Sequence, residues 1–457
     1  MEFFMKLFVN RTKRLFVVPA AFFVGLAVLL TTLGFNAKSW AVHPANLTLY
    51  KNGQMTYFGD ITDITGKMLV YTEGDTRKWN SDANIRKATL HAVGDFDGFI
   101  KTGAQTAFRA QLAGYNPVNG TYGAGNNIML TIDAQICTVA LSALGSRFGA
   151  VGVINYKTGD ILCNVSTPTY DPQSPPSNLS DENKYKGVYV NRLFSGKYAP
   201  GSVFKLVTTA AALENIKDIF DHKYSCHYGV DIKGKTVSCL GNHKSVEIKE
   251  ALKESCNAAF AQITLEVGRS KMKSFTNKIG FGKTYSVDGI KLDACNYDIS
   301  NAKEDVDFGW SGVGQFDDII NPLNYLMYVA SIANGGVQKP AHIIKSIQTP
   351  SGIPQSIRTG LSTRTMSSKT AGNIKEMMRS NVKEKYGESS FPGLNLCAKT
   401  GTAETIEGTI DHSLFVGFMD DPQRPYAFIV VAEHSGAGAN VAAHVANTVL
   451  QEVKKKY

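Results

Sequence analysis

An uncharged stretch near the N-terminus constrains this chain more than any other feature. It runs for 21 residues, from Leu15 to Phe35. A helix needs about 20 apolar residues to cross the hydrocarbon core of a bilayer, so the stretch predicts a transmembrane anchor. Basic residues gather on its N-terminal side and only one follows it closely: Lys6, Arg11, Lys13 and Arg14, then Lys38. The positive-inside bias predicts that residues 1–14 are cytoplasmic and that residues 36–457 lie outside the membrane.

A cleaved signal peptide is the alternative to an anchor. Ala37 and Ser39 are small residues with the spacing of a cleavage site. The apolar stretch, however, is longer than the roughly 7 to 15 residues of a signal-peptide core. We therefore expect an uncleaved, single-pass anchor in the cell membrane.

The composition of the chain favours a folded protein over a disordered one. Of its 457 residues, 43% are hydrophobic and 19% are charged. Its 48 basic and 39 acidic residues give a net charge of +9, spread along the whole sequence. Dedicated nucleic-acid-binding proteins cluster their basic residues, so we expect no nucleic-acid partner. A mildly basic surface suits an acidic polymer or an anionic membrane.

A turn-rich segment, Asn119 to Asn127, predicts a domain boundary near residue 125. Residues 36–124 contain short alternating stretches such as Met68 to Thr72 and a predicted helix at 104–113, and we interpret them as a small pedestal module. Residues 125–457 are long enough for a domain with its own core.

Strands are predicted at both ends of this larger domain and helices in its middle. The predicted strands are 128–132, 150–155, 160–166, 394–404, 413–419 and 426–433. The main predicted helices are 134–144, 202–214, 322–333 and 440–453. This order predicts an α+β domain in which an antiparallel sheet is assembled from both ends of the chain and flanked by helices.

Ser202 and Lys205 lie three residues apart at a predicted helix start. That spacing puts both side chains on one helix face, with Cβ atoms about 5 to 6 Å apart. A serine needs a base to become a nucleophile, and a lysine desolvated beside a helix N-terminus can be neutral enough to accept its proton. The pair alone is weak evidence, because an N-cap followed by a solvated lysine gives the same pattern.

A second pattern, Ser255-Cys256-Asn257, lies at a turn between two amphipathic stretches, 248–254 and 258–267. Its hydroxyl and amide groups can face one cleft, where the hydroxyl could relay a proton and the amide could hold a substrate amide. An ordinary turn with an N-cap is the alternative.

A third pattern, Lys399-Thr400-Gly401-Thr402, lies inside a predicted strand. A glycine there is out of place unless something approaches the backbone closely, and a ligand beside the strand would explain it. A lysine and two hydroxyls would then meet an anionic group. An edge strand with a charge and a gap is the alternative.

The three patterns in this order resemble the set Ser-x-x-Lys, Ser-Asp-Asn and Lys-Thr-Gly of penicillin-binding proteins and serine β-lactamases, with Cys256 at the middle place of the second motif. The context extends the likeness: YAPGSVFK, ESCNAAF, AKTGTAE, LTIDAQ, GAVGVINYKTGDIL and IANGGVQKP. On these segments the chain is similar to a class B penicillin-binding protein over about residues 125–450. The resemblance implies a penicillin-binding/β-lactamase-like transpeptidase domain. In the pedestal module only GDITDITGKML resembles the family, and the module is too short for a glycosyltransferase domain.

The resemblance implies a catalytic role for five residues of the three motifs. Ser202 would be the acylated nucleophile and Lys205 its general base. Ser255 and Lys399 would complete a proton path to the leaving amine. Asn257 would orient the donor peptide.

The resemblance also implies how the substrate is held. Backbone N–H groups of Ser202 and Thr402 would bind the oxyanion of the tetrahedral intermediate. Lys399, Thr400 and Thr402, with Gly401 between the two threonines, would face the terminal carboxylate. No metal and no organic cofactor is required by this chemistry.

The implied function is D,D-transpeptidation, which cross-links peptidoglycan stem peptides through an acyl-enzyme on D-Ala-D-Ala and is blocked when β-lactams acylate Ser202. The expected partners are donor and acceptor stem peptides, β-lactams and a separate glycosyltransferase. A β-lactamase or D,D-carboxypeptidase shares the motifs but lets water reach the acyl-enzyme, and no Glu-x-x-Leu-Asn deacylation motif is found. A catalytically idle β-lactam sensor or scaffold is the alternative from another class.

Cys226 and Cys239 are the only two of the seven cysteines that look like a pair. They lie outside the predicted membrane span on either side of a Gly-rich turn, so a disulfide is the first interpretation. With His227 and His243 they could instead offer zinc ligands, although their spacing matches no standard zinc finger. Free thiols are the third alternative.

Overall fold

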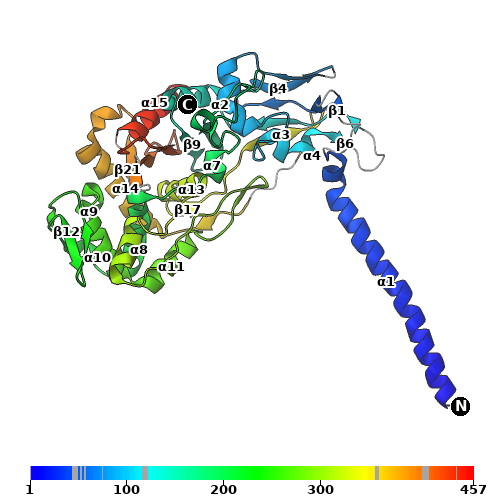
Figure 1. Cartoon of the computed structure of the whole chain (residues 1–457), viewed down its shortest axis with the longest axis horizontal. Coiled ribbons are helices and arrows are strands. Elements are labelled where there is room, and N and C mark those ends of the chain that lie inside the picture. Colours follow the sequence, from blue (N-terminus) through cyan, green and yellow to red (C-terminus); the bar gives the residue numbers. More distant parts are fainter. Residues whose placement is uncertain are drawn as a thin grey trace.

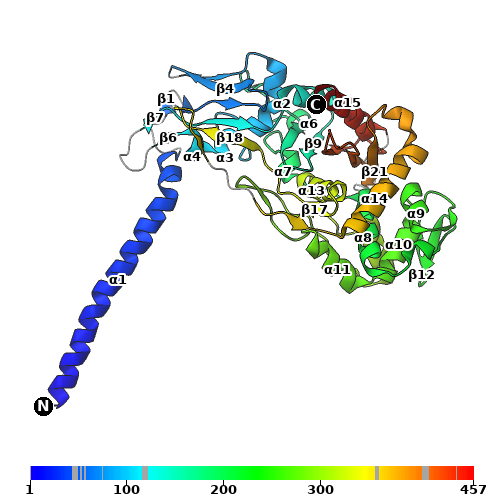
Figure 2. The same ribbon diagram turned by 180° about the vertical axis from the view of Figure 1, so that it is seen from behind.

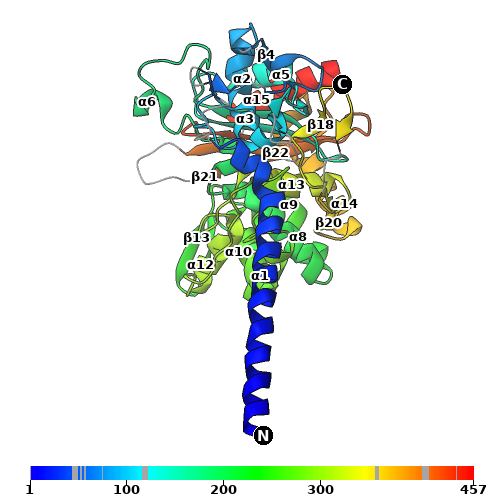
Figure 3. The same ribbon diagram turned by 90° about the vertical axis from the view of Figure 1, so that its right-hand side faces the viewer.

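A long helix stands apart from the rest of the molecule. The computed structural model describes residues 2–43, 50–51, 54–55, 58–74, 76–115, 122–355, 360–403, 411–438 and 440–457. Helix α1 (Glu2–Ala41) projects from the body (Figures 1, 2 and 3). Its segment Leu15–Ala37 is apolar and long enough to span a bilayer, and none of its most apolar window is buried. The predicted anchor therefore lies within one continuous helix that begins before it.

A five-stranded antiparallel sheet forms the centre of the body. Its order is β10-β9-β23-β22-β21. The strands are β9 (Gly149–Asn155), β10 (Ile161–Thr167), β21 (Leu396–Ala403), β22 (His412–Met419) and β23 (Tyr426–Ala432). The first two come from the beginning of the large domain and the last three from its end, which confirms the predicted α+β architecture. Most residues of all five strands are buried, since helices cover both faces.

Helices α2 (Ala83–Val93), α5 (Ala134–Leu144) and α15 (Val441–Lys456) pack together over one face of this sheet. Helices α7 (Arg192–Ser195), α13 (Pro322–Ala333) and α14 (Ser368–Ser380) cover the other face (Figures 1 and 3). The predicted bounds of α5 and α13 agree with the structure. Asp133 and Asn321 cap the two helices through their side chains, which fixes where each begins.

A second sheet has six strands in the order β19-β18-β8-β3-β4-β5. Its members are β3 (Ile61–Thr62), β4 (Met68–Glu73), β5 (Thr76–Trp79), β8 (Asn127–Leu130), β18 (Ile344–Gln348) and β19 (Pro354–Gln355). Only the pair of β3 and β8 is parallel among the pairs of this sheet. Because β3–β5 precede residue 125 and the other strands follow it, the two regions share one sheet.

The helical middle carries the first two motifs. It comprises the 3₁₀ turn η2 (Gly201–Phe204) and helices α8 (Lys205–Asn215), α9 (Ile248–Glu254), α10 (Asn257–Val267), α11 (Arg269–Lys278) and α12 (Asp305–Val313). The single helix predicted from 202 to 214 is therefore wrong at its start. Gly201 has φ +53°, which lies outside the helical region and produces a tighter first turn.

A small arm, residues 224–246, extends from this helical part. It consists of two hairpin-like pairs, β11 (Tyr224–Cys226) with β14 (Lys244–Val246) and β12 (Gly229–Ile232) with β13 (Lys235–Ser238). Figures 1 and 2 both place β12 at the end of the body farthest from α1. The arm is thus remote from the long apolar helix.

Short elements complete the described part of the fold. The helix predicted at 104–113 is instead two four-residue helices, α3 (Ala104–Ala107) and α4 (Arg109–Leu112), which break at the buried Phe108. The others are β1 (Tyr50–Lys51), β2 (Gln54–Met55), β6 (Gly114–Tyr115), β7 (Tyr122–Gly123), α6 (Glu182–Tyr185), η3 (Ile219–Asp221), β15 (Ser286–Val287), β16 (Ile290–Lys291), β17 (Val337–Gln338), β20 (Thr363–Arg364), the π-helical turn η4 (Asn381–Gly387) and η5 (Glu388–Ser390).

Candidate active site

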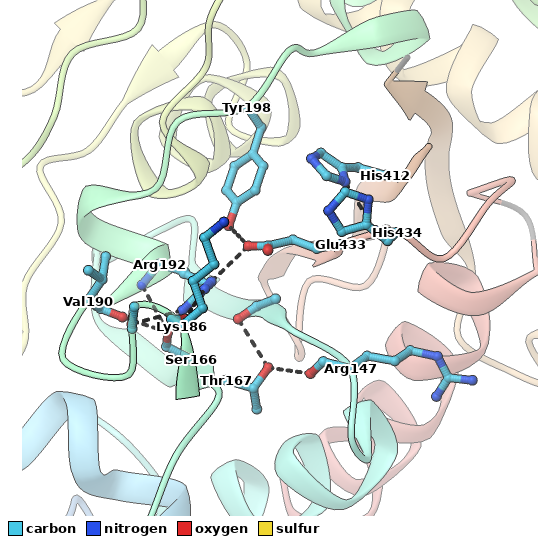
Figure 4. Close-up of polar contacts among 12 residues, drawn as sticks. Arg147, Ser166, Thr167, Lys186, Val190, Arg192, Tyr198, His412, Glu433 and His434 are labelled. Carbon is cyan, nitrogen blue, oxygen red and sulfur yellow. Dashed lines mark hydrogen bonds and ion pairs between the residues drawn. The ribbon is translucent and has the colours of Figure 1, made fainter. Parts of the chain in front are cut away.

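The segment that leads to Ser202 is fixed to the end of the central sheet. Arg192 donates from Nε to Glu433 Oε1 at 2.7 Å, and the Tyr198 hydroxyl donates to the same oxygen at 2.8 Å (Figure 4). Glu433 directly follows β23. A largely buried charge pair holds its geometry well when its other hydrogen bonds are also made, and Arg192 makes two more to backbone carbonyls.

The turn that carries Ser202 packs directly against β21. A Cβ atom on Gly201 would lie 2.2 Å from the Thr402 carbonyl oxygen, and one on Gly401 would lie 2.8 Å from Val203 Cγ1. Both glycines are therefore needed for this contact. The close backbone approach predicted at Gly401 is real, but the approaching group is the chain's own turn η2 rather than a ligand.

Lys205 joins the first motif to the second. Its Nζ atom lies 2.7 Å from Ser202 Oγ, 2.7 Å from Asn257 Oδ1 and 3.2 Å from Ser255 Oγ. The Ser255 carbonyl also accepts from it at 3.0 Å. The side chain is fully buried, and in the described residues no carboxylate lies within ion-pair distance of it. This amine is therefore surrounded by neutral oxygens.

Ser255 lies between two lysines. Lys399 Nζ donates to Ser255 Oγ at 3.0 Å, so the same oxygen contacts both amines. Ser255 ends α9 in the left-handed region, with φ +57° and ψ +38°. A non-glycine residue in that conformation is strained, and such strain is kept where the surrounding structure demands it. Here the conformation turns the chain so that the hydroxyl reaches both amines.

The electrostatics of both lysines follow from burial. Desolvation lowers the pKa of Lys205 from 10.5 to about 7. Desolvation, and then the nearby charge of Lys205, lower the pKa of Lys399 well below its usual value. Two ammonium groups on one serine oxygen would repel each other. A neutral Lys205 beside Ser202 is the form that can accept a proton.

The third motif lies on the edge strand β21 and reaches Ser255 through Lys399. Thr400 and Thr402 are partly exposed on β21, whereas Lys399 and Gly401 are buried. The Thr400 backbone N–H donates to the Tyr386 hydroxyl at 3.2 Å, and the two side-chain oxygens are also 3.2 Å apart. Thr400 and Thr402 are thus the solvent-accessible residues of this motif.

The structure therefore brings all the residues of the three motifs into one site. The motifs extend from Ser202 to Thr402 in the chain, and the contacts of Lys205 and Lys399 with Ser255 bring them together. Sequence reasoning missed Tyr386, which contacts Thr400 from η4, and Ser238, whose carbonyl accepts from Asn257 Nδ2 at 3.2 Å. Neither had a motif around it, so no local signal marked them.

Residues 149–451 match the family model of the penicillin-binding protein transpeptidase domain. The chain belongs to the penicillin-binding protein transpeptidase family. The matched range includes every residue of the site described above. The resemblance found in the three motifs is confirmed.

This penicillin-binding protein has relatives of similar length. It is 26% identical over 451 residues to the peptidoglycan D,D-transpeptidase PbpA of Mycolicibacterium smegmatis, covering 90% of this chain and 91% of the relative. Its fold matches penicillin-binding protein A of Mycobacterium tuberculosis in a ceftriaxone acyl-enzyme complex, with TM-score 0.75, 24% identity, and 87% and 98% of the two chains covered. A D,D-transpeptidase domain from Eggerthella lenta matches with TM-score 0.76 and 25% identity over 88% and 98% of the two chains.

Cys226 and Cys239 lie beside this site, but their neighbours differ from those expected. Cys226 and Cys239 are not joined by a disulfide in the structure. Both sulfurs lie near His243 Nδ1, and Cys239 also lies near Cys256, the middle residue of the second motif. His227, named above as a candidate zinc ligand, is not part of this group.

Proposed function

We propose that this protein is a peptidoglycan D,D-transpeptidase that forms an acyl-enzyme at Ser202 and is acylated by β-lactams at the same atom. The observation that carries the proposal is the 2.7 Å contact between Ser202 Oγ and the buried Lys205 Nζ. The relatives named for this activity and the ceftriaxone acyl-enzyme of a similar fold support it.

In the first half-reaction Ser202 Oγ attacks the carbonyl carbon of the D-Ala-D-Ala bond while its proton passes to Lys205. The backbone N–H groups of Ser202 and Thr402 hold the oxyanion that forms. The C–N bond then breaks, and the proton reaches the departing D-Ala amine through Lys205 and Ser255, which are 3.2 Å apart. The products are an ester on Ser202 and free D-Ala.

In the second half-reaction an amine from a neighbouring stem peptide attacks the ester. The amine gives up a proton to Lys205, and Ser202 Oγ regains one as it leaves. Asn257 orients the donor peptide, with its amide fixed by Lys205 and by the Ser238 carbonyl. Lys399, Thr400, Gly401 and Thr402 form the strand surface that faces the terminal carboxylate.

The place of the protein follows from its substrate, which lies outside the membrane. We infer that residues 1–14 are cytoplasmic, 15–35 cross the membrane, 36–124 form the pedestal, and 125–457 carry the transpeptidase domain. The asymmetry of basic residues around the span supports this orientation. The sheet shared across residue 125 makes the pedestal a rigid support. A separate glycosyltransferase would supply the glycan strands, since the pedestal is too short to contain one.

The test uses the full-length chain in detergent and follows its intact mass after a β-lactam is added. We expect the mass of one antibiotic to be added to the wild type and to persist, and no addition to Ser202→Ala. Ser274→Ala, which removes an exposed hydroxyl on α11, is the matched control and should react like the wild type. Persistent labelling of Ser202→Ala would contradict the assignment of the nucleophile.

A second measurement separates the transpeptidase from its rivals. The wild type is given a synthetic stem peptide ending in D-Ala-D-Ala together with an acceptor amine. A new amide product supports the transpeptidase, whereas hydrolysis alone would indicate a D,D-carboxypeptidase. Rapid loss of the β-lactam adduct with antibiotic turnover would indicate a β-lactamase. A stable adduct with no reaction of the stem peptide would indicate a sensor.

A further inference from the structure

Four side chains beside the active site could bind a metal ion. They are Cys226 at the end of β11, Cys239 after β13, His243 before β14, and Cys256 at the N-terminus of α10. We call them the Cys–His cluster. Their three sulfurs and one ring nitrogen all lie within 4.8 Å of one another, and none of the four is used in the mechanism above.

The separations of these atoms match a tetrahedral zinc site. Zinc has bonds of about 2.3 Å to thiolate sulfur and about 2.0 to 2.1 Å to imidazole nitrogen, so a tetrahedron separates two sulfurs by about 3.8 Å and a sulfur from the nitrogen by about 3.6 Å. His243 Nδ1 lies 3.4 Å from Cys226 Sγ and 3.6 Å from Cys239 Sγ. Cys239 Sγ lies 3.9 Å from Cys256 Sγ.

The surroundings favour a metal over a disulfide. A disulfide would join two sulfurs at about 2.05 Å and would leave the third thiol and the imidazole beside it without a role. Here one ligand atom from each of four separate positions in the chain lies within 4.8 Å of the other three. Cys226 and Cys256 are buried, so a metal bound there is screened from water on one side. Gly241 leaves room for the ring, because a Cβ atom there would lie 2.7 Å from His243 Nε2.

The arm also needs a support of this kind. Its strands have only three or four residues, and half of these residues are exposed. Ile232 and Val237 pack against Ala261 of α10 and Val306 of α12, and a structural metal is a common further support for a unit this small.

We propose that Cys226, Cys239, His243 and Cys256 bind one Zn²⁺ ion as a closed, structural site. All four positions are taken by protein atoms, so the ion holds the arm to α10 and takes no part in the acyl transfer. Three thiolates and one imidazole are the soft ligand set that tetrahedral zinc prefers. The departure from the sequence expectation is that Cys256 replaces His227 as a ligand.

The site would also position the second motif. Cys256 lies between Ser255 and Asn257, which both contact Lys205. Ser238, whose carbonyl holds the Asn257 amide, directly precedes Cys239. Two ligands are thus adjacent to groups that shape the active site, so zinc binding would fix the distance between the arm and the turn. This consequence rests on the proposed function, whereas the binding of zinc does not.

The first test is the metal content of the full-length chain, purified in detergent without added metal and measured by elemental mass spectrometry. We expect one zinc per chain in the wild type and a loss of most of it in Cys239→Ser and His243→Ala. His227→Ala and Cys295→Ser are matched controls, an exposed histidine of the arm and a buried cysteine elsewhere, and should keep the zinc. Full zinc content in both ligand variants would overturn the proposal.

A second measurement does not depend on the folding of variants. The wild-type chain is stripped of metal with a chelator and loaded with Co²⁺, whose absorption spectrum reports tetrahedral thiolate coordination. Strong thiolate charge-transfer bands support the site. A zinc-free wild type that is two protons lighter in intact mass and shows no such bands would overturn it in favour of a disulfide.

The effect on the active site is read in the same samples. We expect removal of zinc to lower the melting temperature and slow acylation by a fluorescent β-lactam, with both restored when Zn²⁺ is returned. If zinc is bound but its removal leaves acylation unchanged, the site exists and the positioning role is overturned. If the zinc-loaded protein does not react with β-lactams at all, the proposed function fails and the metal site stands.

Discussion

The catalytic centre and the Cys–His cluster meet at Ser255-Cys256-Asn257, but different parts of the fold hold them. Lys205 and Lys399, the two lysines of the proposed mechanism, are fully buried, the first on α8 and the second on the edge strand β21. Three of the four cluster residues lie in an arm of short strands with exposed faces. A polar group in a packed core keeps its place because its neighbours cannot move. In the arm, the proposed bonds to the metal ion would fix the side chains in the same way.

The two regions also treat charge differently. Burial favours the neutral form of Lys205, because an isolated ammonium is costly away from water. The cluster would instead bring together thiolates and a divalent cation, so that opposite charges cancel. Burial would let Lys205 act as a base, whereas the proposed metal would join the arm to α10.

Replacing Lys205 by methionine should have the largest effect. The change removes the base but keeps an apolar chain of similar length, so we expect the acylation rate to fall by a factor of roughly 100 to 10,000. Because Lys205 contacts Ser255 and Asn257 but is not itself one of the four proposed ligands, the zinc content should be unchanged. Both are measured on one preparation, with a fluorescent β-lactam and by elemental analysis. Loss of zinc in this variant would show that the two regions are not independent.

A pair of glycine variants compares how tightly the two regions are packed. Gly201 (φ +53°) and Gly234 (φ +85°) both have positive φ, but a Cβ atom meets the Thr402 carbonyl at 2.2 Å in the first and nothing within 4 Å in the second. Gly201→Ala should lower the free energy of unfolding by about 1 to 3 kcal/mol more than Gly234→Ala does. It should also slow acylation.

Gly234→Ala, in the arm, is the control for strain at positive φ. Thermal unfolding gives the stability of both variants, and β-lactam labelling gives their reactivity. Equal losses in the two variants would mean that the contact between η2 and β21 is not as tight as the structure shows.

The pH dependence of acylation should show the smallest effect, and its sign follows from Lys205. Its pKa is lowered to about 7, so below that pH the amine is charged and cannot accept the Ser202 proton. We expect the rate constant to fall about tenfold for each pH unit below 7 and to level off above it. Thermal unfolding over the same range checks that the fold is intact. A midpoint near the ordinary lysine value would mean that Lys205 is charged at neutral pH.

Much of the fold could be predicted because local signals agreed with it. The bounds of α5 and α13 follow from apolar periodicity together with a side chain that caps each helix, Asp133 and Asn321. Strands β9 and β23, at the two ends of the large domain, are largely apolar stretches, whereas β21 carries Lys399 and two threonines. The single helix predicted from 202 to 214 failed because the tight turn at Gly201 is imposed by contact with Thr402, far along the chain.

The sequence by itself determined the residue types of the site, the anchor and the family, because motifs and apolar stretches are local properties. Only the tertiary structure decided that Ser255 adopts a left-handed conformation between two amines, and that His243 and Cys256 rather than His227 accompany Cys226 and Cys239. These features depend on contacts between segments that are distant in the chain. The same is true of the low pKa of Lys205, since burial by the folded core, and not the neighbours of Lys205 in sequence, removes its water.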